Sequence, residues 1–168
     1  MASDEEIFEI GLLDSYTIEM KGKLLVSLQF VLLFSLALMP GSKASSPARS
    51  SIAIALALIA LLILLRSFKD LGSALTPLPE SKEGANLVTS GIYSYIRHPI
   101  YSALFILALA AYLWKQSGSV FIAALLLVAL LIYKARYEDE ILLKKFPESL
   151  GFQESTPAFF PKLRKERA

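Results

Sequence analysis

Four runs of apolar residues dominate the pattern of hydrophobic and polar positions along the chain. They cover residues 24–39, 51–65, 100–114 and 120–133, and none of them contains a charged side chain. The second run, SIAIALALIALLILL, has no polar face beyond Ser51, whereas a surface helix of a soluble protein shows a polar stripe. Each run is shorter than the roughly 20 residues of a typical membrane-crossing helix, so a soluble bundle with a very apolar core is the alternative.

The absence of charge and of a polar stripe favours membrane-spanning helices. Basic side chains at the ends of the runs can snorkel to the interface and lengthen the spans; they are Arg66, Lys115, Lys134 and Arg136. Pro40 and Gly41 end the first run and open a polar loop. Residues 116–119 form a tight connection, which predicts that the third and fourth helices make an antiparallel hairpin.

Small residues share one face of the second helix and favour close helix contact there; they are Ala53, Ala57 and Ala60. The pattern therefore predicts an all-α polytopic membrane helix bundle of about four transmembrane helices, with a helical C-terminal tail. Residues 1–23 form a mostly acidic leader, for which a short interfacial helix and a loosely ordered segment are alternatives. A cleaved signal peptide starts with positive charge, so cleavage is not expected. Residues 24–66 then hold the first two transmembrane helices, and residues 67–168 form the core with the loop, the hairpin and the tail.

Composition narrows the chemistry that the chain can support. Of its 168 residues, 55% are apolar and 19% are charged, which is fewer charges than the roughly 25% of soluble domains. The chain has no cysteine, which excludes disulfides, thiolate metal sites and a cysteine nucleophile. His98 is the single histidine, so a multi-histidine metal site is excluded. A net charge of +2 is too small to indicate nucleic acid as a partner, and membrane lipids are the expected surroundings.

The distribution of charge predicts the orientation of the bundle. With four spans, both termini share one side with the loop between the second and third helices. All of the 17 basic residues except Lys43, Arg49 and Lys115 fall on that side, as do all 15 acidic residues. The positive-inside rule then places both termini and any charged active site in the cytoplasm.

The segment most suited to chemistry precedes the third run and reads TPLPESKEGANLVTSGIYSYIRHPIY, residues 76–101. Pro99 suits the first turn of a helix, whose start offers unpaired N–H groups and a positive dipole end. Arg97 and His98 sit beside that start, and Gly91 would let the backbone approach a ligand closely. Together they indicate a receptor for a carboxylate or phosphate, although each residue alone is typical of a membrane interface.

The fourth run passes into KARYEDEILLKKFP, residues 134–147, where polar residues are dense. On a continuing helix Arg136 and Glu140 share a face, while Glu138 points elsewhere. From these residues alone, a solvated helix end with ion pairs is as reasonable as a functional site.

Taken together, these segments resemble the isoprenylcysteine carboxyl methyltransferase and phospholipid methyltransferase superfamily of membrane enzymes. The resemblance runs from about residue 71 to residue 163. It rests on an ordered set of motifs: LGSALTPLP (71–79), LVTSGIY (87–93), RHPIY (97–101), Glu138-Asp139 with Leu142 and Phe146-Pro147, and TPAFFP (156–161). The order makes the set specific, whereas RHP alone would mean little.

In that family, S-adenosylmethionine (SAM) sits at the cytoplasmic ends of the last helices. The resemblance implies that SAM and its methionyl carboxylate are held by Leu87, Val88, Gly91, Tyr93, Arg97, His98, Pro99 and Tyr101. It also implies that Glu138 binds SAM and acts in catalysis, with Arg136 as the second catalytic candidate. The chain departs from the family pattern at Asp139, which replaces a second glutamate, and at Ser102, which often is glycine. Ser149 and Phe152 stand where relatives often have tyrosine.

The implied function is SAM-dependent methyl transfer to a lipidic or isoprenoid-linked acceptor. Correct alignment of donor and acceptor contributes on the order of 7–11 kcal/mol to such a displacement. A carboxylate acceptor needs no base and is favoured, whereas an amine must lose a proton, for which Glu138 is the candidate base. One alternative is a membrane isomerase or reductase of isoprenoids or sterols, with His98 as a haem ligand. The other is a non-enzymatic protein that holds anionic lipid with Arg97 and the basic tail.

Overall fold

The computed structural model describes residues 4–42, 46–72 and 87–161, which form helices and no strands. In chain order the elements are α1 (Asp4–Leu38), α2 (Pro47–Leu71), the 3-10 turn η2 (Gly91–Ser94), α3 (Pro99–Lys115), α4 (Gly118–Lys145) and α5 (Ser149–Ser155). The predicted all-α fold is confirmed for these residues. Most of the LGSALTPLP motif and the basic tail from residue 162 lie outside them.

The helices are longer than the apolar runs in the sequence. Three of them contain apolar stretches long enough to cross a membrane, at Tyr16–Leu38 (23 residues), Pro47–Leu71 (25 residues) and Gly118–Lys145 (28 residues). At about 1.5 Å per residue these exceed the roughly 30 Å of a hydrocarbon core. The fourth, Pro99–Lys115, is a shorter apolar helix. The apolar runs underestimated the lengths of the helices, because backbone hydrogen bonding continues through the polar residues that flank each run. The chain folds as an integral membrane helix bundle.

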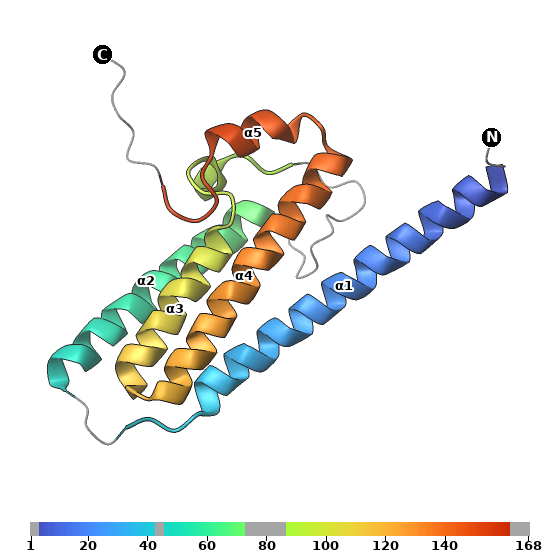
Figure 1. Cartoon of the computed structure of the whole chain (residues 1–168). Helices are drawn as coiled ribbons and strands as arrows, with labels where there is room; N and C mark the ends of the chain where they lie inside the picture. Colours follow the sequence, from blue (N-terminus) through green and yellow to red (C-terminus); the bar gives the residue numbers. More distant parts are fainter. Residues whose placement is uncertain (1–3, 43–45, 73–86, 162–168) are drawn as a thin grey trace, which may run out of the picture.

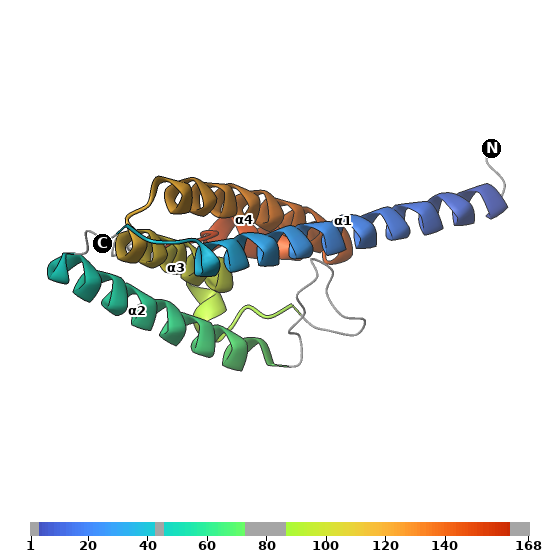
Figure 2. The same cartoon turned by 90° about the horizontal axis from the view of Figure 1, so that it is seen from below.

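The acidic leader does not form a separate element. From Asp4 onward it is continuous with the first transmembrane helix in α1, and the candidate span includes residues from Tyr16 onward, which belong to the predicted leader. The helix α1 continues without a break across the expected boundary between residues 23 and 24. The N-terminal part of α1 extends past the other helices in both views (Figures 1 and 2).

The helices pack as an α2–α3–α4 layer with α1 lying along α4 (Figure 1). α2 makes its most extensive contacts with α3, and α3 and α4 form the predicted hairpin. The turn between them depends on Gln116, which adopts a left-handed conformation with φ 49° and donates its N–H to Tyr112 O. As a result, the start of α3, the end of α4 and α5 gather at one end of the bundle (Figure 1).

Burial in this bundle is typical of a protein solvated by lipid. Leu127 and Leu131 of α4 are completely buried at the centre of the core. Large apolar side chains on the outer faces remain exposed, including Leu62 at 65% and Leu38 at 80%. The buried face of α2 carries small side chains, as predicted: Ala53 and Ala60 are buried and Ala57 is partly buried.

The cations at the helix ends do not all snorkel to the interface as expected. Lys115 Nζ instead donates to three carbonyls at the end of α1, those of Leu36 (2.8 Å), Ala37 (2.6 Å) and Met39 (2.6 Å). Those carbonyls lack partners within the helix, so the ammonium group caps them. Lys134 is only 2% exposed and points into the bundle. Their partners lie far away in sequence, which is why the flanking positions suggested interface anchors.

Candidate functional site

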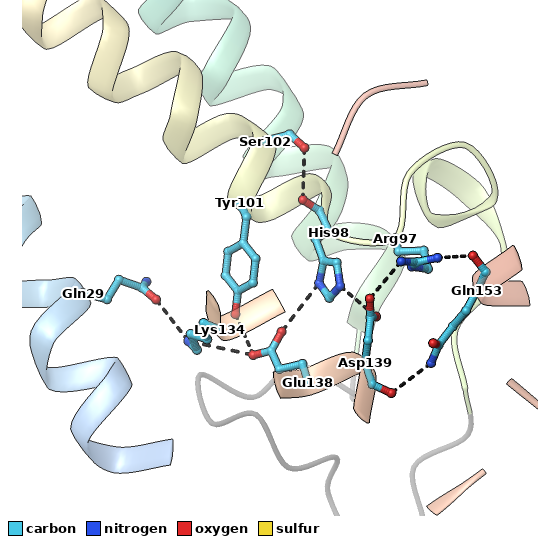
Figure 3. Close-up of polar contacts among 9 residues, drawn as sticks. All are labelled: Gln29, Arg97, His98, Tyr101, Ser102, Lys134, Glu138, Asp139 and Gln153. Carbon is cyan, nitrogen blue, oxygen red and sulfur yellow. Dashed lines mark hydrogen bonds and ion pairs between the residues drawn. The ribbon is translucent and has the colours of Figure 1, made fainter. Parts of the chain in front are cut away.

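The start of α3 and the second half of α4 meet at the end of the bundle that carries α5 (Figure 3). Arg97 Nη2 donates to Asp139 Oδ2 at 2.8 Å, and His98 Nε2 lies 3.0 Å from Asp139 Oδ1. These side chains are between 11% and 17% exposed. The RHP motif and the acidic pair therefore lie together at this end of the bundle, and Asp139 makes the closest of these contacts.

Glu138 completes the arrangement on the other side of the histidine ring. Tyr101 Oη donates to Glu138 Oε1 at 2.6 Å, and His98 Nδ1 lies 3.6 Å from Glu138 Oε2. The rings of His98 and Tyr101 stack with centroids 5.5 Å apart and planes 7° from parallel. The imidazole thus stands between two carboxylates, one at each nitrogen (Figure 3).

A buried lysine extends this group toward α1. Lys134 lies one turn before Glu138 on α4, and its Nζ is 4.0 Å from Glu138 Oε1 and 5.3 Å from the centre of the Tyr101 ring. It also donates to Gln29 Oε1 of α1 at 3.0 Å. We call Arg97, His98, Tyr101, Lys134, Glu138 and Asp139 the polar cluster. A buried ion in a membrane span requires partners, and Lys134 has them in Gln29 of α1, Tyr101 of α3 and Glu138 of α4 (Figure 3).

The TPAFFP motif, residues 156–161, returns to the start of α3; we call it the closing segment. The backbone N–H of Arg97 donates to Pro157 O and that of His98 to Ala158 O, both at 2.9 Å. Arg97 Nη1 donates to Thr156 O at 2.9 Å and also to Gln153 O. The backbone N–H groups of Arg97 and His98 are therefore occupied, and Arg97 acts as a clamp on the closing segment.

Ser102 explains one departure from the family pattern. The side chain is 2% exposed, and its Oγ donates to Phe159 O at 2.6 Å. The Oγ also lies 3.1 Å from His98 O, one turn earlier on α3. A glycine here would leave the carbonyl of Phe159 without this donor, so the serine attaches the closing segment to α3.

Gly91 has a different role from the one its motif suggested. It adopts a φ of +61°, a region that disfavours residues with a Cβ, and an added Cβ would collide with the carboxylate of Asp70. The space beside Gly91 is thus taken by the end of α2. Because Gly91 has no Cβ, the carboxylate of Asp70 can lie close to the backbone at this position.

Tyr93 follows on η2 and is 7% exposed. Its hydroxyl is buried and has no hydrogen-bond partner within the part of the chain that the structure describes. Burial, together with the negative charges of Asp70 and Glu138, raises the pKa of the Tyr93 phenol well above its usual range. The Tyr93 side chain is thus a neutral, buried phenol with an uncommitted donor.

Comparison with known proteins identifies the family of this chain. The sequence model of the family described as phospholipid methyltransferase matches residues 48–149, more than half of the chain. The chain belongs to the phospholipid methyltransferase family. The matched residues include α2, α3 and α4, so α1 with Gln29 and the closing segment lie outside the match.

Two curated relatives are similar to this chain over about half of its length. The nickel-cobalt-cadmium resistance protein NccN of Alcaligenes xylosoxydans xylosoxydans is 40% identical over 85 residues, which are 49% of this chain and 39% of the relative. The cobalt-zinc-cadmium resistance protein CzcN of Cupriavidus metallidurans is 42% identical over 87 residues, 49% of this chain and 38% of the relative. The matched part thus spans well under two thirds of either relative.

The other residues that the sequence predicted for the site lie outside the polar cluster. Leu87 and Val88 are partly buried in the segment before η2, and Pro99 is buried as the first residue of α3. Arg136 is exposed, and its position two residues before Glu138 turns it about 200° around α4. Arg136 therefore points away from the polar cluster. Glu140 is exposed two residues beyond Glu138, so it does not substitute for the second glutamate of the motif.

Residues that the sequence had not assigned to the site carry much of its structure. Asp139 takes the place of the second glutamate and binds both Arg97 and His98. Ser149 is fully buried, with an Oγ that lacks a partner among the described residues, while Phe152 is partly buried. The acidic pair of the motif was the sequence feature that could have identified Asp139 as a site residue. Nothing local to the sequence indicated that Lys134 or Asp70 would join it.

Proposed function

We propose that the protein is a SAM-dependent methyltransferase that acts on a lipidic or membrane-partitioned acceptor. The observation that carries the proposal is the polar cluster, where His98 and Tyr101 of α3 meet the two adjacent carboxylates of α4. Membership of the phospholipid methyltransferase family supports the reaction class.

The residues of the site fit SAM in three respects. Carboxylates and aromatic faces stabilise a cation such as a sulfonium, and Glu138 lies against Tyr101 here. The buried hydroxyl of Tyr93 has no partner among the described residues and is free to donate to a ligand. Leu87 and Val88 supply partly buried apolar surface in the segment before it. Pro99, Gly91 and Arg97 then act indirectly, by shaping the start of α3, the η2 turn and the closing segment.

SAM supplies an electrophilic methyl group on a positively charged sulfur. The task left to the protein is to orient donor and acceptor and to exclude water, which accounts for on the order of 7–11 kcal/mol in well-aligned reactions. Tyr101 and His98 hold the side chain of Glu138 in one orientation. The closing segment covers the start of α3 through its contacts with Arg97 and Ser102.

The contacts of Glu138 favour a carboxylate acceptor over an amine. A general base must be able to receive a proton from the acceptor. The carboxylate of Glu138 already accepts a hydrogen bond from Tyr101 and lies near His98 and Lys134. A carboxylate acceptor is ionised near neutral pH and requires no base, so O-methylation agrees best with this arrangement.

SAM binding tests the proposal directly. Isothermal titration of the detergent-purified protein is expected to show saturable binding, weakened on the order of tenfold or more by His98→Ala and by Glu138→Gln. Arg136→Ala is the matched control, because Arg136 is exposed on the same helix. Absence of binding by the wild-type protein, or equal binding by all variants, would reject SAM as the cofactor.

The acceptor is identified by the stability of the product. Membranes incubated with the enzyme and methyl-labelled SAM are extracted, and the lipid fraction is treated with mild alkali. A methyl ester releases volatile labelled methanol, whereas an N-methyl group stays on a headgroup that is not volatile. Alkali-resistant label would reverse our preference and assign Glu138 as the base for an amine acceptor.

We also propose that the polar cluster and both termini face the cytoplasm, as the positive-inside rule predicts. The chain contains no cysteine, so single cysteines can report accessibility without background. Glu148→Cys lies next to α5 at the cluster end, and Ser119→Cys lies at the opposite end of α4. An impermeant maleimide is expected to label only Ser119→Cys in intact cells; the reverse pattern would invert the topology.

A further inference from the structure

The end of α2 contacts the turn that carries Tyr93. Asp70, the penultimate residue of α2, accepts a hydrogen bond from Ile92 N at 2.7 Å and from Arg66 Nε at 2.9 Å, both at Oδ2. Its side chain is 10% exposed. A carboxylate from one transmembrane helix thus binds the backbone of η2, which lies 22 residues further along the chain.

This contact requires the glycine that precedes Ile92. A Cβ at Gly91 would overlap the carboxylate of Asp70, and the φ of +61° is also unfavourable for other residues. The sequence therefore meets two conditions at once, an acid at the end of α2 and a glycine at the start of η2.

A carboxylate in the last turn of a helix is unfavourable by itself. The C-terminal end of a helix carries partial negative charge, and cations are preferred there. Arg66 offsets part of this charge, but its side chain is 54% exposed, so the offset is partial. The position of Asp70 is better explained by its hydrogen bond to the backbone of η2 than by the stability of α2.

The residue that η2 presents is Tyr93, whose buried hydroxyl has no partner among the described residues. The charges of Asp70 and Glu138 both act on this phenol, so it lies within electrostatic reach of each. We propose that Asp70 is a positioning residue of the SAM site, which fixes η2 so that the hydroxyl of Tyr93 faces the bound cofactor. This inference rests on the proposed function and adds α2 to the site.

A double-mutant cycle on SAM affinity tests the coupling of Asp70 and Tyr93. Asp70→Ala and Tyr93→Phe are each expected to weaken binding on the order of tenfold. The double variant is expected to bind no more than about twofold more weakly than Tyr93→Phe, because residues that act through one another are not additive. Asp70→Asn keeps a carbonyl acceptor for Ile92 N and is expected to restore part of the affinity. Lys69→Ala, an exposed neighbour, is the control and leaves binding unchanged.

A second measurement reports on Tyr93 without SAM. The protein is labelled with 3-fluorotyrosine, and the fluorine resonance of position 93 is identified by its loss in Tyr93→Phe. Asp70→Ala is expected to shift this resonance, and Lys69→Ala is not.

The results separate this inference from the proposed function. An unshifted resonance, an unchanged affinity in Asp70→Ala, or effects that multiply in the double variant would each overturn the positioning role while leaving SAM binding intact. A wild-type protein that does not bind SAM would reject both.

Discussion

Replacement of Arg97 by lysine tests whether the arginine of the RHP motif is a clamp. Arginine has a planar fork with several donors, whereas lysine has one nitrogen on a flexible stem. Arg97 uses the fork to reach Asp139 Oδ2 with Nη2 and the carbonyls of Thr156 and Gln153 with Nη1. Arg97→Lys keeps the charge and can keep the ion pair, but it cannot reach all three acceptors.

The expected loss follows from the two carbonyl contacts. Hydrogen bonds that involve a charged group contribute about 1.5–3 kcal/mol each. Arg97 is 14% exposed, so water replaces part of what is lost, and we expect a decrease of about 2–4 kcal/mol in the free energy of unfolding. For a protein of this length that corresponds to a decrease of at least about 5 °C in Tm.

Thermal unfolding in detergent measures the change, and limited chymotrypsin digestion locates it. Cleavage at Phe152 and Phe159 is expected to accelerate, because the closing segment loses its attachment to α3. Arg136→Lys is the matched control, since Arg136 is exposed and surface changes stay within about 0.5 kcal/mol. If Arg97→Lys matched this control in both assays, the clamp would be refuted and the arginine would be available to a ligand.

Three further predictions concern other parts of the bundle. Ser102→Ala removes the donor to Phe159 O and is expected to cost about 1–2 kcal/mol in thermal unfolding; unchanged Tm and digestion would argue against this attachment. Lys115→Met uncaps the carbonyls at the end of α1 and is expected to cost about 1–2 kcal/mol, whereas Lys144→Met, exposed in the last turn of α4, should be close to neutral. The raised pKa of Tyr93 means that its phenol stays protonated when folded but ionises near pH 10 when unfolded, so it contributes stability that falls as pH rises above about 10. The free energy of unfolding of the wild type should then decrease more steeply than that of Tyr93→Phe between pH 9 and 11, by up to about 1.4 kcal/mol per pH unit, and parallel curves would contradict the burial of the phenol.

The sequence determined the elements of this protein because their causes are local. Uncharged apolar runs specify helices that lipid can surround, and a short polar connection specifies the α3–α4 hairpin. Pro99 correctly predicted the start of α3, because a helix readily accepts proline only in its first turn. The motifs also identified His98, Tyr101 and Glu138, which the structure brings together. The continuity of α1 from Asp4 was not predicted, because hydropathy does not record that a helix continues through charged residues.

Only the tertiary structure decided which polar groups are partners. The sequence indicated Arg97 as an anion receptor, but in the structure its N–H groups donate to carbonyls of the closing segment, some sixty positions later. Gly91 looked like a ligand contact until Asp70 occupied the space beside it. Residue types and their helical phase can be read along a chain, but a hydrogen bond depends on a separation of about 3 Å between groups on different helices. That separation is set by how the helices pack, which no single segment specifies.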